Sequence, residues 1–157
     1  DKLLRIAGIR HADLKGFSFS REDVDARSLA NQYAQILGQV FTHEMKPMEV
    51  EILVAEVGHD PAGDQLFHIL YDGTLIDETG WAVLGGEAEA IGERMGSAWV
   101  EGGTLAQAVN AAVTALAGPE RTIPVTELEV AVLARGNGRR TFQRIEDDEL
   151  TPLIEPS

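Results

Sequence analysis

The sequence predicts an α+β fold in which helices cover packed, mostly antiparallel sheets. The predicted helices occur in pairs, and the strands between the pairs are connected by hairpins. Strands and helices therefore do not alternate one by one, as they would in βαβ units. The change from helical spacing of apolar residues to the alternation of a strand is clearest where a helix over 24–43 is followed by a strand over 49–57. With 157 residues, 44% of them hydrophobic, the chain is long enough to form a single domain over 1–157 with its own core.

Two helices are predicted first, over 1–14 and 24–43. The chain starts at Asp1 inside the first helix, without a capping signal, so we interpret it as the larger, C-terminal part of a longer subunit. The second helix repeats its apolar residues at the spacing of one buried face: Leu29, Tyr33, Ile36, Leu37, Val40 and Phe41. Pro47 cannot continue this helix and biases Lys46 toward an extended backbone.

Three strands are then predicted, over 49–57, 66–71 and 81–84. The segment 60–64 has the Asp, Pro and Gly residues of a hairpin loop, and Asp72-Gly73 marks the next turn. The pattern therefore predicts short antiparallel strands in this part of the chain.

A second helix pair is predicted over 87–101 and 104–117. Thr104 and Gln107 form a capping-box pattern at the start of the second of these helices, and Gly118-Pro119 ends it.

The last elements are strands over 126–134 and 140–145 and a short terminal helix. Asn137-Gly138 suits a two-residue type I′ turn between the strands. The acidic residues 146–149 favour a helix N-terminus before Leu150.

Charge and composition exclude several partners. A formal net charge of −13 argues against nucleic acid and anionic membranes, because phosphate binding needs clustered Lys and Arg. No apolar run approaches the roughly 20 residues that span a bilayer, and the first residues lack the apolar segment of a signal peptide. Without any cysteine, disulfide and thiolate chemistry are excluded. The lack of cysteine does not fix the compartment by itself, but with the missing apolar segments it favours a soluble intracellular protein, so a cytoplasmic location is expected.

The residues that could carry chemistry have simpler structural interpretations, so we predict no catalytic, cofactor or metal site. The four histidines lie singly on different elements, without the spacing that places two metal ligands on one helical face. Gly85-Gly86 lacks the further glycines or Lys of a phosphate-binding loop. The acidic pairs Glu127/Glu129 and Asp147/Asp148 fit the polar face of a strand and a helix N-terminus.

Short segments in a particular order link the chain to a known family. They occupy 8–9, 12–13, 16–17, 19–24, 27–34, 46–47, 49–51, 54–57, 71–73, 85–86 and 128–133. Examples are Arg27-Ser-Leu-Ala-Asn-Gln-Tyr-Ala34 and Leu128-Glu-Val-Ala-Val-Leu133. In their order and spacing the chain resembles the α-type subunit of the actinobacterial 20S proteasome, without the family's N-terminal gate, first helix and first strands.

The resemblance implies a four-layer αββα sandwich of the N-terminal-nucleophile hydrolase type, with its N-terminal strands missing here. It also implies a non-catalytic subunit of a threonine endopeptidase complex. Neighbouring α-subunits in a seven-membered ring, proteasome β-subunits and a ring-shaped ATPase or other activator would be its partners. Two alternatives stay open: a fragment of a β-type threonine peptidase subunit, and a small acidic α/β enzyme with a site at Gly85-Gly86.

The resemblance also suggests which residues form subunit interfaces. Phe17 and Phe19 lie in a charged loop and are predicted to anchor a contact between adjacent α-subunits, with Arg21 in its polar rim. The alternative is that both Phe side chains pack on their own subunit's core. Tyr33 and Ala34 lie on the helix that the resemblance directs toward the β-ring.

Overall fold

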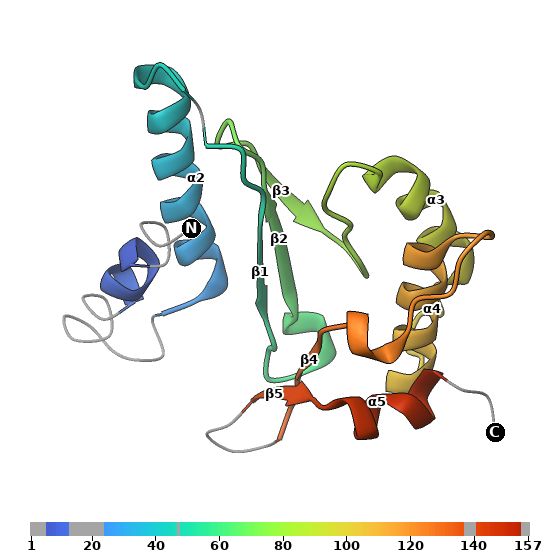
Figure 1. Ribbon diagram of the computed structural model, residues 1–157. Helices are drawn as coiled ribbons and strands as arrows, with labels where there is room; N and C mark the ends of the chain where they lie inside the picture. The colour runs from blue at the N-terminus through green and yellow to red at the C-terminus, as the bar shows by residue number, and fades with distance from the viewer. Residues whose placement is uncertain (1–5, 13–23, 47, 137–140, 155–157) are drawn as a thin grey trace. The chain divides into compact units, whose positions relative to one another are not determined.

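The computed structural model describes residues 6–12, 24–46, 48–136 and 141–154, which form helices and antiparallel sheets. The chain divides into two compact units, Asp1–Ala82 and Val83–Ser157. The first unit contains helix α2 and a three-stranded sheet, and the second contains helices α3, α4 and α5 with a two-stranded sheet (Figure 1).

Helix α2 (Ala26–His43) confirms the helix predicted over 24–43. The side chain of Asp25 caps its first turn by accepting a hydrogen bond of 2.7 Å from the backbone N–H of Ser28. The helix ends at Glu44, whose backbone is extended, shortly before Pro47 in the sequence. Of the helix predicted over 1–14, residues 6–12 are helical, and the remainder lies outside the described residues.

The sheet of the first unit has the strand order β1-β2-β3, and both pairs are antiparallel. The strands are β1 (Ile52–Glu56), β2 (Gln65–Ile69) and β3 (Leu75–Glu78). The β1–β2 loop contains the short 3₁₀ helix η2 (Pro61–Gly63), which Asp60 caps, as the turn residues predicted.

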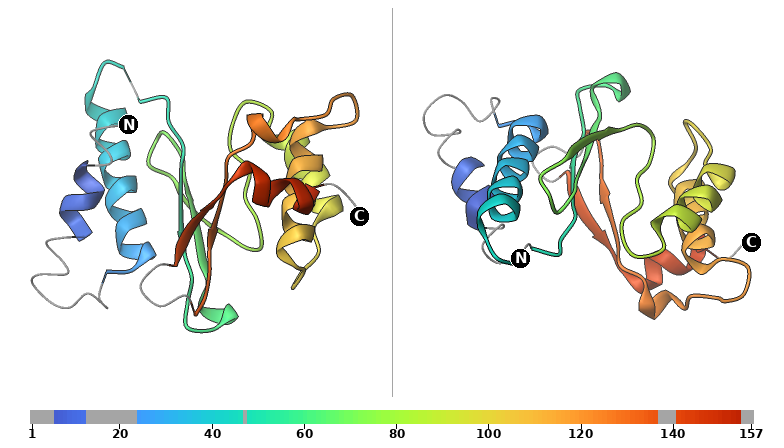
Figure 2. Two further views of the ribbon diagram at one scale, coloured as in Figure 1. Left: turned by 60° about the horizontal axis from the view of Figure 1, so that its bottom comes forward. Right: turned by 90° about the horizontal axis from the view of Figure 1, so that it is seen from above.

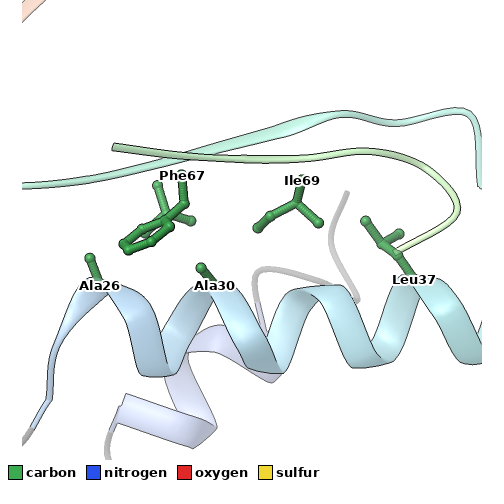
Figure 3. Close-up of a cluster of buried hydrophobic side chains, with 6 residues drawn as sticks. Ala26, Ala30, Leu37, Phe67 and Ile69 are labelled. Carbon is green, nitrogen blue, oxygen red and sulfur yellow. The ribbon is translucent and has the colours of Figure 1, made fainter. Parts of the chain in front are cut away.

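Helix α2 covers one face of this sheet (Figure 2), and the core of the unit lies between them. Phe67 and Ile69 of β2 are fully buried against the side of α2 that carries Ala26, Ala30 and Leu37 (Figure 3). Burying side chains of the size of Phe and Ile contributes about 1.5–3 kcal/mol each. The small alanines let the helix approach the sheet closely beside the Phe67 ring.

Polar contacts fix the N-terminal end of α2 to the same sheet. The backbone N–H of Ala26 donates a 2.7 Å hydrogen bond to the carboxylate of Glu56 on β1. The guanidinium of Arg27 lies 4.8 Å from the centre of the Phe67 ring and 3.3 Å from the carboxylate of Asp77 on β3. The start of α2 is therefore tied to all three strands.

The middle of α2 lies against the turn between β2 and β3. Gly73 has a φ of +87°, and an added Cβ there would lie 2.5 Å from the carbonyl oxygen of Ala34 and 2.8 Å from Cα of Gly38. Hydrogen bonds from the backbone N–H and the hydroxyl of Thr74 hold the pKa of Asp72 below its usual value. Both residues of the predicted Asp72-Gly73 turn are therefore needed for its conformation.

The prediction of a strand over 81–84 was wrong, and the third strand is instead β3 (Leu75–Glu78). Residues 81–84 are apolar and half-buried, but they have no strand partner in the described part of the chain. The apolar run was mistaken for a strand because burial, rather than sheet pairing, explains its composition.

The second unit begins with a pair of packed helices, α3 (Ala88–Ala98) and α4 (Leu105–Ala117). The predicted capping box is present at α4, with Thr104 and Gln107 each accepting from the other's backbone N–H. Gly118 ends α4 with a φ of +67°. The guanidinium of Arg94 on α3 donates a 2.7 Å hydrogen bond to the carbonyl of Ala115, in the last turn of α4.

A two-stranded antiparallel sheet and helix α5 (Asp147–Ile154) complete this unit. Its strands are β4 (Val130–Leu133) and β5 (Phe142–Ile145). The predicted strand over 126–134 is therefore too long at its start, where Val125–Glu127 form the 3₁₀ helix η3. The predicted Asn137-Gly138 turn lies outside the described residues. Leu150 of α5 is fully buried, and Asn110 of α4 donates to the carbonyl of Leu153.

None of the helices in the described ranges is both long and apolar enough to cross a bilayer.

Replacing Gly73 with Ala should destabilise the first unit, because the new Cβ meets the backbone of α2 and the positive φ is strained. Gly102→Ala is the matched control, since Gly102 also has a positive φ but an added Cβ there meets nothing within 4 Å. We expect a loss of about 1 kcal/mol for the control and ~3 kcal/mol for Gly73→Ala, measured by urea unfolding. Equal losses would contradict the close approach of α2 to the turn.

Candidate functional site

Three of the four histidines in the described part of the chain make contacts within the fold. The imidazole of His11 lies 2.8 Å from the hydroxyl of Ser28, and that of His43 lies 3.1 Å from the carbonyl of Gln39. His59 is exposed in the β1–β2 loop. Across residues 6–12, 24–46, 48–136 and 141–154, no three His, Asp or Glu side chains are grouped so that they could hold a metal ion.

His68 is the histidine whose surroundings the sequence did not reveal. It is 7% exposed, lies in the central strand β2 and has a carboxylate beside each ring nitrogen. Nε2 is 2.7 Å from Glu51, which precedes β1, and Nδ1 is 3.4 Å from Glu78 on β3. These three residues become neighbours only through the strand register, in which His68 pairs with Leu53 and Ile76.

Gly85 and Gly86, the alternative enzyme site, lie in an open turn before α3. Gly85 has a φ of +114°, and an added Cβ at either glycine would meet nothing within 4 Å. Glu87 precedes α3 without making a side-chain cap. The segment before these glycines is irregular, so the strand predicted over 81–84 does not lead into α3.

The acidic pairs are placed on the surface and do not face each other across a site. Glu129 forms an exposed ion pair of 2.8 Å with Arg144 on β5, and Glu127 lies in the 3₁₀ helix η3 rather than in a strand. Asp147 and Asp148 lie in the first turn of α5, as predicted, where the helix dipole favours negative charge.

Of the predicted interface residues, Tyr33 and Ala34 lie on α2 and are half-buried against the core of their own unit. The ring of Tyr33 lies where a side chain at Gly8 would be, so Gly8 allows the helical segment 6–12 to approach α2 closely. Ala34 lies beside Gly73, the turn glycine. Both residues therefore have contacts within the chain itself.

Phe17, Phe19 and Arg21 lie outside the described residues. Their role as ring contacts stays a prediction.

The exposed side of α2 is polar along most of its length. Asn31, Gln35 and Gln39 recur at a spacing of four residues and are all exposed. Near the C-terminal end, Ile36, Gln39, Val40, His43 and Glu44 line a hollow of ≈ 480 Å³. The surface of α2 is thus uncharged over its middle turns.

Apolar side chains are exposed at the C-terminal end of α2. The rings of Phe41 and Tyr71 are in edge-to-face contact, with centroids 5.6 Å apart, and each residue is 47% exposed. Met45 is fully exposed just beyond the helix. The helical spacing predicted Phe41 on the buried face of α2, but Phe41 is half exposed and its ring packs on Tyr71 in the turn after β2.

No protein-family model matches the chain. Curated actinobacterial proteins named proteasome subunit alpha are similar to nearly all of it. The protein from Acidimicrobium ferrooxidans is 57% identical over 96% of this chain, and that from Xylanimonas cellulosilytica is 50% identical over 94%. The protein from Kineococcus radiotolerans is 47% identical over 96% of the chain. The chain spans 65% of the length of the first two relatives and 68% of the third.

Replacing Tyr33 with Ala should destabilise the folded chain, because its half-buried ring packs on the core and beside Gly8. A loss of about 2 kcal/mol is expected, less than for a fully buried aromatic residue. Gln35→Ala, on the exposed side of the same helix, should change the free energy of unfolding by less than ~0.5 kcal/mol. Urea unfolding of both variants measures the difference, and an unchanged stability of Tyr33→Ala would make Tyr33 an interface residue alone.

Proposed function

Because the chain belongs to the proteasome α-subunit family, we propose that it is a non-catalytic α-ring subunit of a 20S proteasome core particle. The observation that carries this proposal is 43–57% identity to proteins named proteasome subunit alpha along about 95% of the chain. Its partners would be neighbouring α-subunits in a seven-membered ring and the β-subunits that carry threonine endopeptidase activity. The assembly would degrade proteins in the cytoplasm.

The contacts of the described side chains support a structural role. Hydroxyl and carboxylate groups that could serve in catalysis instead cap helices or bind backbone groups, as Thr104, Asp25 and Glu56 do. Histidine side chains bind a hydroxyl, a carbonyl and carboxylates within their own unit. Each group has a role in holding the fold, and the proposal assigns the covalent chemistry to a separate β-subunit.

We further infer that the two compact units belong to one α-type domain, a four-layer αββα sandwich of the N-terminal-nucleophile hydrolase type. Two features of the chain support this inference. Each unit pairs helices with an antiparallel sheet, as the outer and inner layers of a sandwich require. The β4–β5 sheet has only two strands, and a pair of this kind is marginally stable unless it is packed or extended.

The proposed ring contacts use the first helix pair and the loop between its helices. We place α2 toward the β-ring, with the uncharged exposed residues Asn31, Gln35 and Gln39 available for contact. Uncharged amides lose less hydration energy on burial than charged groups do. Phe17 and Phe19, with Arg21, would contact the adjacent α-subunit. The α-ring would narrow the substrate entry and receive a ring-shaped ATPase or another activator.

The full-length protein should form a seven-membered ring, or a barrel when a β-subunit partner is present. Native mass spectrometry would measure the subunit number. Peptidase activity on a short fluorogenic peptide should appear only after the β-subunit is added, because the proposal assigns the threonine nucleophile to the β-subunit. A monomer that binds nucleotide, or hydrolysis by the purified α-protein alone, would overturn the proposed function.

A charge placed on the exposed side of α2 should impair barrel assembly. Gln35→Asp introduces a carboxylate that the β-ring contact would have to desolvate, and we expect at least a tenfold loss of assembled barrel. A charge at the neighbouring Ala34 would be a less suitable test, because Ala34 is half-buried in its own unit and the charge would also affect folding. A charge at Gln107 would be an unsuitable control, because the Gln107 side chain caps α4. Ala90→Asp, exposed in the first turn of α3, is the control. Equal assembly of both variants by size-exclusion chromatography would contradict this orientation.

A further inference from the structure

His68 connects the three strands of the first unit through its two ring nitrogens. The central strand β2 carries the imidazole, whose side chain is 10% exposed, while the carboxylates come from Glu51 beside β1 and Glu78 on β3. The distances are 2.7 Å from Nε2 to Glu51 and 3.4 Å from Nδ1 to Glu78. The bond to Glu51 has the length of a charge-assisted hydrogen bond.

The number of protons on the ring decides whether both contacts are favourable. An ionised carboxylate only accepts hydrogen bonds, so each of the two nitrogens must carry a hydrogen to donate to its carboxylate. The imidazolium form has both hydrogens and a positive charge between the two negative groups. In the neutral form one nitrogen presents a lone pair, which would repel the carboxylate that it faces.

The charged residues of the unit that contact α2 or Phe67 lie on the opposite face of the sheet from His68. Residues 67 and 69 of β2 point toward α2, so the alternating strand directs His68 away from that helix. Arg27, Glu56 and Asp77 make their contacts with α2 or with Phe67 on that helix-covered face. The partners of His68 in strand register, Leu53 and Ile76, are apolar. Glu51 and Glu78 are therefore the charged groups from β1 and β3 that face the imidazole.

We propose that His68 is a pH-sensitive clamp that holds β1 and β3 on β2 while the ring is protonated. When the pH rises, the proton leaves for solvent, one carboxylate loses its partner and the sheet is held less tightly. The contribution of the clamp to stability is therefore present while both ring nitrogens carry a hydrogen, and it is lost when one of these hydrogens leaves. The clamp acts within one unit, so the inference stands whether or not the chain assembles into a ring.

The clamp also explains why two carboxylates lie beside the buried imidazole. Glu51 and Glu78 have side chains that are 36% and 27% exposed, so each is partly removed from water. Two like charges near each other on one sheet face would repel unless a cation lay between them. The imidazolium supplies this cation, and removing its charge leaves the two carboxylates without compensation.

The test compares the full chain with His68→Gln, His68→Arg and Glu78→Gln by urea unfolding at about pH 5.5 and 8.5, above the range in which carboxylates titrate. His59→Gln is the control, because His59 is an exposed histidine of the same unit. Gln cannot carry charge, whereas Arg keeps its charge at both pH values. Glu78→Gln removes the carboxylate that requires the second proton and would remain informative if a substitution at His68 prevented folding.

At pH 5.5, His68→Gln should raise the unfolding equilibrium constant about tenfold relative to the natural chain, and this difference should shrink at pH 8.5. His68→Arg and Glu78→Gln should both reduce the pH dependence, while His59→Gln should keep it. In nitrogen NMR spectra at pH 5.5, both ring nitrogens of His68 should carry a hydrogen. Parallel pH profiles for the natural chain and His68→Gln, an unchanged profile for Glu78→Gln, or a ring with a single hydrogen at pH 5.5 would overturn the proposal.

Discussion

The packing of Phe67 against the alanines of α2 is the contact on which the rest of the first unit depends. Phe67 is fully buried in the central strand, and Ala26 and Ala30 leave room for its ring on the helix. Because β2 has a neighbouring strand on each side, a helix fixed at β2 covers all three strands. The ion pair between Arg27 and Asp77 is exposed, so it contributes less to stability than the buried Phe67 ring does. The partly buried hydrogen bond from Ala26 to Glu56 fixes the direction in which the helix starts.

The period of two along β2 lets adjacent residues serve different purposes. Phe67 and Ile69 face the helix, while His68 between them faces the other side and has carboxylates as neighbours. A shift of the strand register by one residue would turn the imidazole toward α2 and the Phe67 ring toward the two carboxylates. The hydrophobic contact and the charged contact therefore favour the same register.

The sequence was sufficient to predict features that depend on local chemistry. The capping box of Thr104 and Gln107 and the turn at Gly73 use residues a few positions apart, so their patterns are visible in one segment. Strand β3 was missed because Leu75–Glu78 is short and lacks clear alternation, while the apolar residues 81–84 resembled a strand more closely. The pairing of β3 with β2 is a tertiary contact that a local pattern does not contain.

The residues around His68 and Tyr33 could not be predicted from the sequence, because they are also brought together by tertiary contacts. His68, Glu51 and Glu78 come from three segments, and only the register of two strand pairs brings them together. Tyr33 was predicted as an interface residue, and its contact with Gly8 depends on how two helices pack. The family could be recognised from the order of many short segments, but the side of a helix that meets a partner depends on which residues the fold itself leaves exposed.

The exposure of a side chain does not by itself identify the side of a helix that meets a partner. Phe41 and Tyr71 are half exposed, yet each ring is held by the other in an edge-to-face contact, so the pair is ordered without a partner. Gln35 is the opposite example. An exposed uncharged amide does not by itself indicate a partner, but it can be buried in an interface at a lower cost than a charged group. The proposed interface on α2 therefore rests on the lack of charge along Asn31, Gln35 and Gln39, and the aromatic pair at the end of the helix does not support it.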